Sequence, residues 1–271
     1  MSRIAPTFQR LAAAKRAALI PYITAGYPDM ATTLPLMNAL VAAGGDIIEV
    51  GVPFSDPMAD GPVIQKACCR ALEQGATLRD VLDTVAQFRR ENDDTPVVLM
   101  TYCNPVEAMG PARFAAAAAA AGADGVLMVD LPPEESAALA RPLREHGLDA
   151  IFLLSPTTAE ARMRDICAAA SGFVYYVSLK GVTGAGHLNT DEVGARVRQV
   201  KQCTDLPVAV GFGVRDAAAA ASVARQADGV VVGSALVDAV ARQPDVRQSC
   251  AAVGALLGGM RKALDAAEAA A

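Results

Sequence analysis

Two carboxylates lie close together in Glu49–Pro62, a segment rich in proline and glycine. Glu49 lies inside a short apolar run, and Asp60 follows it by eleven residues. A carboxyl group that is partly removed from water has a raised pKa, so it can exchange protons near neutral pH. The pair therefore predicts acid/base chemistry. The structural alternatives are a buried ion pair for Glu49 and a turn position for Asp60.

A second group of residues is suited to binding an anion. Three glycine-bearing loops occur late in the chain, at Gly181–Gly184, Gly211–Gly213 and Gly233–Ser234. Glycine lets backbone N–H groups approach an anion closely, and a helix N-terminus favours negative charge. Each loop alone would be an ordinary turn, but together they predict a phosphate site that can rely on backbone donors without a cluster of Lys or Arg.

The elements that must position these residues are read from eight apolar runs of four to six residues, which alternate with helical patterns. Such continuous apolar runs are typical of parallel strands covered on both faces. The expected strands are Leu19–Thr24, Asp46–Gly51, Val97–Tyr102, Gly125–Val129, Ala150–Leu154, Phe173–Ser178, Pro207–Gly211 and Gly229–Gly233. Eight strand–helix units in about 250 residues predict an α/β fold, a (β/α)8 TIM barrel.

The barrel is expected to form one domain over residues 1–271, because no linker divides the chain. Short extra helices are expected at the N-terminus (Pro6–Ala14), after the second strand (Val63–Glu73) and after the eighth (Ser234–Val240). An open, doubly wound sheet is the alternative fold. It is disfavoured because no GxGxxG pattern follows the first strand and eight units exceed its usual number.

In a barrel of this kind the active site lies at the carboxyl ends of the strands. Ile48 and Val50 take the helix-facing side of the second strand, so alternation points Glu49 into the barrel mouth. Met100 and Leu127 lie near the mouth ends of their strands and can form an apolar pocket for a flat ring. Tyr175 reaches the same cavity or packs in the core. The residues alone thus indicate an enzyme acting on a phosphorylated, partly apolar substrate.

Composition excludes several classes of function. The chain has 24 basic and 29 acidic side chains, a net charge of −5, which lacks the basic field that nucleic acids or anionic membranes require. Its two histidines and six cysteines show no metal-ligand spacing, so no metal site is expected. The scattered cysteines, without a signal sequence, indicate a reduced, cytoplasmic location.

Six segments resemble the tryptophan synthase alpha chain family, in order and at similar spacing, from about Phe8 to about Val240. They are Pro21–Pro28, Glu49–Pro62, Val129–Glu135, Gly181–Gly184, Gly211–Val214 and Val232–Ala235. The Glu49–Pro62 segment is highly specific, whereas the glycine loops alone are not. The resemblance implies a lyase that splits indole-3-glycerol phosphate into indole and glyceraldehyde 3-phosphate by a retro-aldol reaction.

The resemblance also assigns roles to individual residues. Glu49 would be the general acid/base, and Asp60 would accept a hydrogen bond from the indole N–H. The phosphate would be held by Gly184, Gly213, Gly233 and Ser234. The indole pocket would be formed by Tyr22, Met100, Leu127 and Tyr175, and Thr183 would close a loop onto Asp60. Two departures from many relatives are Leu179-Lys180 in place of an Arg after Ser178, and Tyr22 where Phe is common.

A partner is implied by the same resemblance. The family works with a β chain that carries pyridoxal phosphate and condenses indole with L-serine to L-tryptophan, in an α2β2 assembly. Pro53–Pro57 and Asn104–Met109 would face that chain, and no cofactor is expected in this one. Two alternatives stay open: another phosphate-binding barrel enzyme of aromatic amino-acid biosynthesis, for which no strand lysine is found, and a non-catalytic regulatory partner of the β chain.

Overall fold

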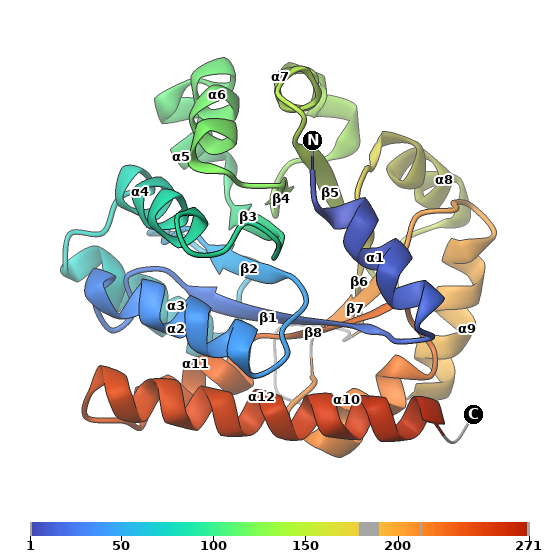
Figure 1. The fold of residues 1–271 in the computed structure, drawn as a ribbon. Helices are drawn as coiled ribbons and strands as arrows, with labels where there is room; N and C mark the ends of the chain where they lie inside the picture. Colours follow the sequence, from blue (N-terminus) through green and yellow to red (C-terminus); the bar gives the residue numbers. More distant parts are fainter. Residues whose placement is uncertain (1, 179–189, 212, 270–271) are drawn as a thin grey trace.

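The computed structural model describes residues 2–178, 190–211 and 213–269. Eight parallel strands form a closed barrel in the order of the sequence, with β8 paired to β1 (Figure 1). The strands are β1 (Ala18–Thr24), β2 (Ile48–Gly51), β3 (Val97–Thr101), β4 (Gly125–Met128), β5 (Asp149–Leu154), β6 (Val174–Val177), β7 (Val208–Gly211) and β8 (Gly229–Val232). Each overlaps an expected run, so the (β/α)8 prediction is confirmed.

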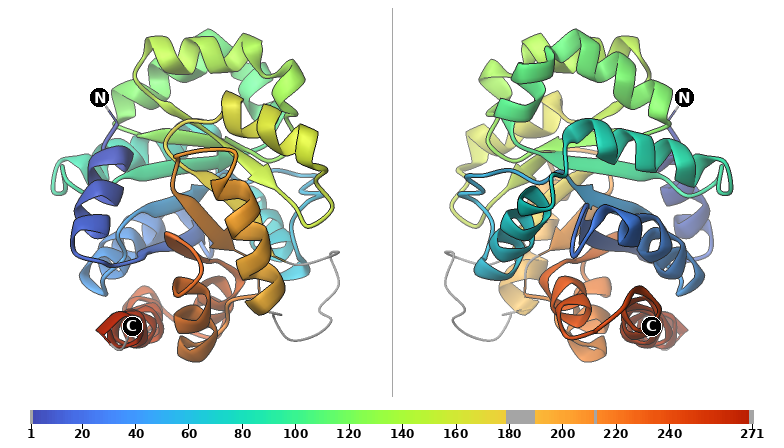
Figure 2. Two further views of the ribbon diagram at one scale, coloured as in Figure 1. Left: turned by 90° about the vertical axis from the view of Figure 1, so that its right-hand side faces the viewer. Right: turned by 90° about the vertical axis from the view of Figure 1, so that its left-hand side faces the viewer.

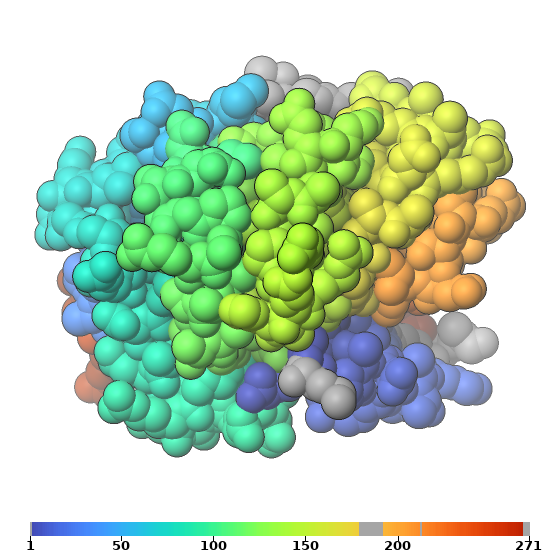
Figure 3. All heavy atoms as spheres, turned by 90° about the horizontal axis from the view of Figure 1, so that it is seen from above, coloured from blue at the N-terminus to red at the C-terminus, as the bar shows by residue number. Residues whose placement is uncertain are grey.

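Helices surround the barrel on its outer side (Figures 1 and 2). They are α2 (Met30–Ala42), α4 (Leu78–Arg89), α6 (Pro111–Ala121), α7 (Ala137–Glu145), α8 (Glu160–Ala169), α9 (Thr190–Lys201), α10 (Ala217–Ala224) and α12 (Val246–Ala269). The last helix runs beneath the barrel in Figure 1 and packs against α2 and α10. Figure 3 shows the molecule from above relative to Figure 1, and segments from the middle of the chain, green and yellow, lie side by side on this face. None of the helices in the described part of the chain is both long and apolar enough to span a membrane.

The three expected extra helices are present as α1 (Ile4–Ala13), α3 (Pro62–Glu73) and α11 (Ser234–Ala241). A short helix directly after β3, α5 (Cys103–Met109), was not expected. The Cys103 N–H at its start donates to Asp130 Oδ1 at 2.8 Å. Because that carboxylate lies at the end of the next strand, the sequence around Cys103 does not predict the start of this helix. After β4, a 3₁₀ turn, η1 (Pro133–Glu135), precedes α7, which starts at Ala137.

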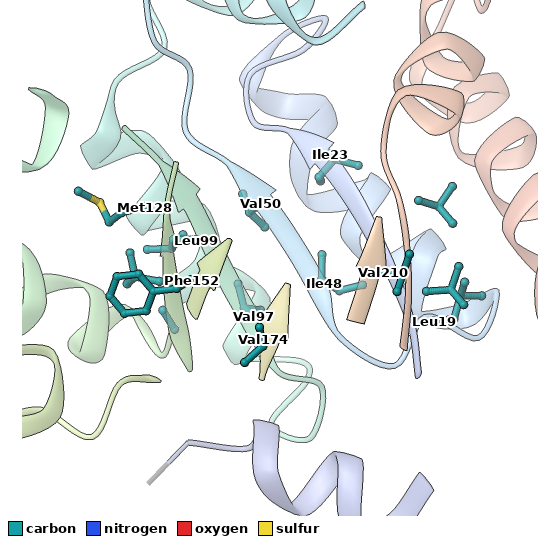
Figure 4. Close-up of a cluster of buried hydrophobic side chains, with 14 of the residues drawn as sticks. Leu19, Ile23, Ile48, Val50, Val97, Leu99, Met128, Phe152, Val174 and Val210 are labelled. Carbon is teal, nitrogen blue, oxygen red and sulfur yellow. The ribbon is translucent and has the colours of Figure 1, made fainter. Parts of the chain in front are cut away.

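Side-chain alternation along the strands separates two apolar layers. Ile48 and Val50 are buried between the strands and the outer helices (Figure 4). Ile47 points the opposite way and belongs to a separate cluster inside the barrel. This parity confirms the prediction for β2, because Glu49 must share the inward face with Ile47.

The floor of the barrel is closed by α1. Its Phe8 ring packs against Phe173, with ring centroids 5.7 Å apart, and Ile4 lies in the same interior cluster. Asp124, whose side chain is 1% exposed, binds Arg3 at 3.0 Å and Arg89 at 2.7 Å. The apolar plug and this buried carboxylate hold α1 and α4 to the floor, so any open cavity must lie at the other end.

Candidate active site

Glu49 sits in the middle of β2 with its side chain directed into the barrel, and it is only 2% exposed. Burial and the nearby negative charge of Asp60 raise the pKa of Glu49 to about 8. Its Oε1 atom has no hydrogen-bond partner among the described residues. A buried carboxyl of this kind exists in both protonation states near neutral pH, as an acid/base group requires.

Asp60 is brought to the same place by the loop that follows β2, and it is also 2% exposed. The Tyr102 hydroxyl donates a hydrogen bond to Asp60 Oδ2 at 2.9 Å and accepts one from the Ala59 N–H at 3.2 Å. Burial raises the pKa of Asp60 to about 6, while the bond from Tyr102 acts to lower it. Asp60 Oδ1 has no partner among the described residues.

Tyr102 therefore belongs to the candidate site, although it is not among the residues expected from the sequence. It lies one residue beyond β3, and the ring of Phe54 stacks on it with centroids 5.1 Å apart. Its hydroxyl fixes the loop to the barrel at Asp60. The sequence signal that could have found it was its place at the carboxyl end of the third expected strand, where barrel enzymes gather functional residues.

A cavity of about 520 Å³ opens at the carboxyl ends of the strands and joins most of the expected site residues. Its lining includes Tyr22, Glu49, Asp60, Met100, Tyr175, Gly213, Gly233 and Ser234. A neighbouring cavity of about 500 Å³ shares Asp60, Met100 and Tyr175 with the first and is lined by Leu127. The two cavities form adjoining compartments that meet at these three shared residues, and both carboxylates line the first. Of the expected residues, Thr183 and Gly184, with Leu179 and Lys180, lie outside the described part of the chain.

The far end of the first compartment is made of the turns after β7 and β8. Gly213 has φ of +85°, a conformation that glycine adopts without strain. Gly233 is the N-cap of α11 and offers no side-chain cap, and Ser234 begins the helix. The first N–H groups of a helix lack intrahelical acceptors, so this end suits an anion.

The family model described as "Tryptophan synthase alpha chain" matches residues 8–265. The chain belongs to the tryptophan synthase alpha chain family. It is 60% identical over 266 residues to the alpha chain of Thioalkalivibrio sulfidiphilus (strain HL-EbGR7), covering 98% of this chain and 100% of that one. It is 57% identical to that of Azoarcus sp. (strain BH72), over 98% and 97% of the two chains.

Solved structures of tryptophan synthase alpha chains have the same fold as this chain. The crystal structure of tryptophan synthase subunit alpha from Legionella pneumophila str. Paris superposes with a TM-score of 0.91 at 45% identity, over 98% of this chain and 99% of that one. The activity of the tryptophan synthase alpha chain family is the lyase half-reaction that cleaves indole-3-glycerol phosphate, so the expected enzyme class is confirmed. The family also implies a β chain as partner, and the pyridoxal phosphate belongs to that chain.

Two tyrosines of this alpha chain fit into its barrel because small residues face them. A Cβ atom at Gly51 would lie 2.6 Å from Tyr22 Cζ, and one at Gly211 would lie 2.6 Å from Tyr175 Cζ. The Tyr22 hydroxyl forms a 3.1 Å hydrogen bond with Thr24 Oγ1. Tyr22 is thus accommodated by Gly51 and hydrogen-bonded within its own strand.

The described residues offer neither a cluster of metal ligands nor a lysine at the cavities. No group of three or more His, Cys, Asp or Glu is placed to hold a metal ion within them. No lysine of the described ranges lines either cavity. The strand lysine that would favour the alternative, another phosphate-binding barrel enzyme, is therefore not found at the site in this part of the chain.

Proposed function

We propose that Glu49 and Asp60 perform the retro-aldol cleavage of indole-3-glycerol phosphate in this chain. One observation carries the proposal: two buried carboxylates each direct an oxygen without a partner among the described residues into one part of the barrel mouth. An unsatisfied buried acceptor costs about 1–3 kcal/mol. A substrate that supplies N–H and O–H donors to these oxygens removes that cost.

The reaction needs one proton given and one taken. Protonated Glu49 gives its proton to indole C3, which leaves positive charge on the ring. The resulting carboxylate then takes the proton of the side-chain hydroxyl, a C=O bond forms, and the bond between C3 and the side chain breaks. The electron pair of that bond returns to the ring, so indole and the aldehyde leave and Glu49 is protonated again. A pKa of about 8 suits both steps near neutral pH.

Asp60 has the complementary role. With a pKa of about 6 it is ionised at neutral pH, so its free Oδ1 can accept the indole N–H and stabilise the charge that develops on the ring. Tyr102 holds the other oxygen, Oδ2, and so fixes the direction in which the carboxylate points. Two carboxylates in these roles suffice for the reaction, and we propose no cofactor or metal in this chain.

The remaining assignments divide the cavity between the two ends of the substrate. The indole ring lies among Tyr22, Met100, Leu127 and Tyr175, which line the two compartments beside the carboxylates. The phosphate lies on Gly213, Gly233 and Ser234, supported by the uncapped start of α11. By resemblance, Gly184 completes this cradle and Thr183 closes its loop onto Asp60.

We further propose an α2β2 assembly in the cytoplasm. The loop at 53–57 and α5 are candidates for the contact with the β chain, since Phe54 stacks on Tyr102, the residue preceding α5. Met58, at the end of that loop, is 78% exposed, which is unusual for a large apolar side chain. Indole released beside Asp60 would leave toward this face.

The test is indole release from indole-3-glycerol phosphate, measured with and without a β chain. Glu49→Gln and Asp60→Asn should each lower kcat at least 100-fold while the substrate still binds, because one acid/base group contributes about 10²–10⁴ and one charge-stabilising group about 10²–10³. Glu73→Gln, an exposed carboxylate on α3, is the matched control and should behave like wild type. Activity of either site variant within about tenfold of wild type would contradict the assignment. Loss of turnover in the variants with unchanged activation of the β chain would separate catalysis from a purely regulatory role.

A further inference from the structure

The phosphate end of the larger cavity contains charged side chains in addition to backbone donors. Arg215, Asp238 and Arg242 line the same cavity of about 520 Å³ as Gly213 and Ser234. From the sequence, we expected backbone donors and Ser234 at this end, without a cluster of Lys or Arg. Three charges at one end of a substrate cavity therefore need an explanation of their own.

Two of the three charges neutralise each other. Arg242 Nη2 lies 3.4 Å from Asp238 Oδ2, one helical turn away at the end of α11. Arg215 has no such partner, since it forms no hydrogen bond or ion pair with any residue in the described ranges. The adjacent Asp216 is engaged as the N-cap of α10, where Oδ1 accepts the Ala219 N–H at 2.8 Å. Arg215 is thus an uncompensated cation two residues beyond Gly213.

The rest of the protein repels an anionic substrate. The chain carries a net charge of −5, and the other end of the cavity buries Glu49 and Asp60. A phosphate that enters the barrel mouth approaches Asp60, which is ionised at neutral pH, and Glu49, which adds a second negative charge when it has given up its proton. An exposed cation beside the cradle offsets this repulsion over a distance of several ångströms, and salt weakens its effect.

We propose that Arg215 is a specificity-determining residue, which attracts the phosphate dianion to the backbone cradle and favours phosphorylated over neutral ligands. The inference rests on the proposed placement of the phosphate at Gly213 and Ser234. A unit cation about 8 Å from a dianion in a water-like dielectric changes affinity about fivefold. Arg215 therefore acts on substrate binding and not on bond cleavage.

The experiment compares Arg215→Gln, Arg215→Lys and Arg225→Gln in the complex with a β chain, at low and high ionic strength. Arg225 is the matched control, because it is an exposed arginine next to α10 that lines neither cavity. Arg215→Gln should raise KM about fivefold at low ionic strength with kcat unchanged, and the difference should shrink at high ionic strength. Arg215→Lys and Arg225→Gln should remain near wild type.

Product inhibition supplies a readout that a merely structural role would not give. Arg215→Gln should raise the inhibition constant of glyceraldehyde 3-phosphate by a similar factor and leave that of indole, which is neutral, unchanged. An unchanged KM, an equal effect on both inhibitors, a fall in kcat or a failure of lysine to restore KM would each overturn the inference. Gly213→Val separates the two proposals. If this variant leaves KM unchanged, the proposed phosphate site at Gly213 and Ser234 is wrong. If Gly213→Val raises KM but Arg215→Gln does not, only the role of Arg215 is refuted.

Discussion

Replacing Glu49 by glutamine should make the folded protein more stable at neutral and alkaline pH. Burial and Asp60 shift the pKa of Glu49 from 4.5 to about 8. Between these two values the folded chain holds a proton that the unfolded chain has released. Folding therefore takes up a proton in this window, and the free energy of unfolding of the wild type falls as pH rises from about 4.5 to about 8. Glutamine does not titrate, so the variant lacks this fall.

The size of the effect follows from the shift. A difference of one pKa unit corresponds to about 1.4 kcal/mol. In the unfolded chain the carboxyl has a pKa of 4.5, and pH 7 is about 2.5 units above that value. The destabilisation at pH 7 is then on the order of 3 kcal/mol relative to pH 4, and it grows toward pH 8. Glu49→Gln should gain this amount over the wild type at pH 7 and lose the advantage near pH 4.

Urea unfolding of the isolated chain at several pH values between 4 and 9 measures the difference. Glu73→Gln, which removes an exposed carboxylate of similar size, should track the wild type throughout. A constant difference between Glu49→Gln and the wild type across this range would refute the reasoning, because only a proton held by the folded state makes the difference depend on pH. The same series tests whether the active site is kept at the expense of stability.

Three further perturbations test other parts of the structure. Tyr102→Phe removes the bond that lowers the pKa of Asp60, so the acid limb of the pH profile of kcat/KM should move above about pH 6; an unmoved limb would remove Tyr102 from the site. Gly51→Ala places a Cβ atom 2.6 Å from Tyr22 Cζ and should cost about 1–3 kcal/mol of unfolding free energy, measured by urea unfolding; a neutral change would show that the ring moves freely. Asp124→Ala leaves the arginines of the barrel floor without a buried partner and should cost about 3–5 kcal/mol; a loss under 1 kcal/mol in the same assay would contradict the role of the floor.

The fold could be predicted from the sequence because apolar runs and helical patterns alternate regularly along the chain. Buried parallel strands have a continuous apolar character, and all eight expected runs overlap strands of the barrel. α5 was not predicted from the sequence, because its start depends on Asp130, a residue that only the folded barrel brings near Cys103. Local patterns contain no information on contacts of this kind.

Some residues of the candidate site could likewise be predicted from the sequence, and others could not. The orientation of Glu49 follows from strand alternation, and the glycine turns follow from their places after β7 and β8. Tyr102 and Arg215 were not identified from the sequence. Their roles depend on where the loop carrying Asp60 folds and on which charges remain unpaired around the cavity. Those are properties of three-dimensional packing.

The helix that closes the barrel floor also constrains the order of folding. α1 is synthesised before every strand of the barrel, yet Phe8 packs on Phe173, and Arg3 binds Asp124, 121 residues further along the chain. Contacts between such distant residues form slowly, because a long loop must close first. Phe8 therefore lacks its Phe173 partner during translation until residue 173 has left the ribosome, and the barrel floor cannot be completed before then.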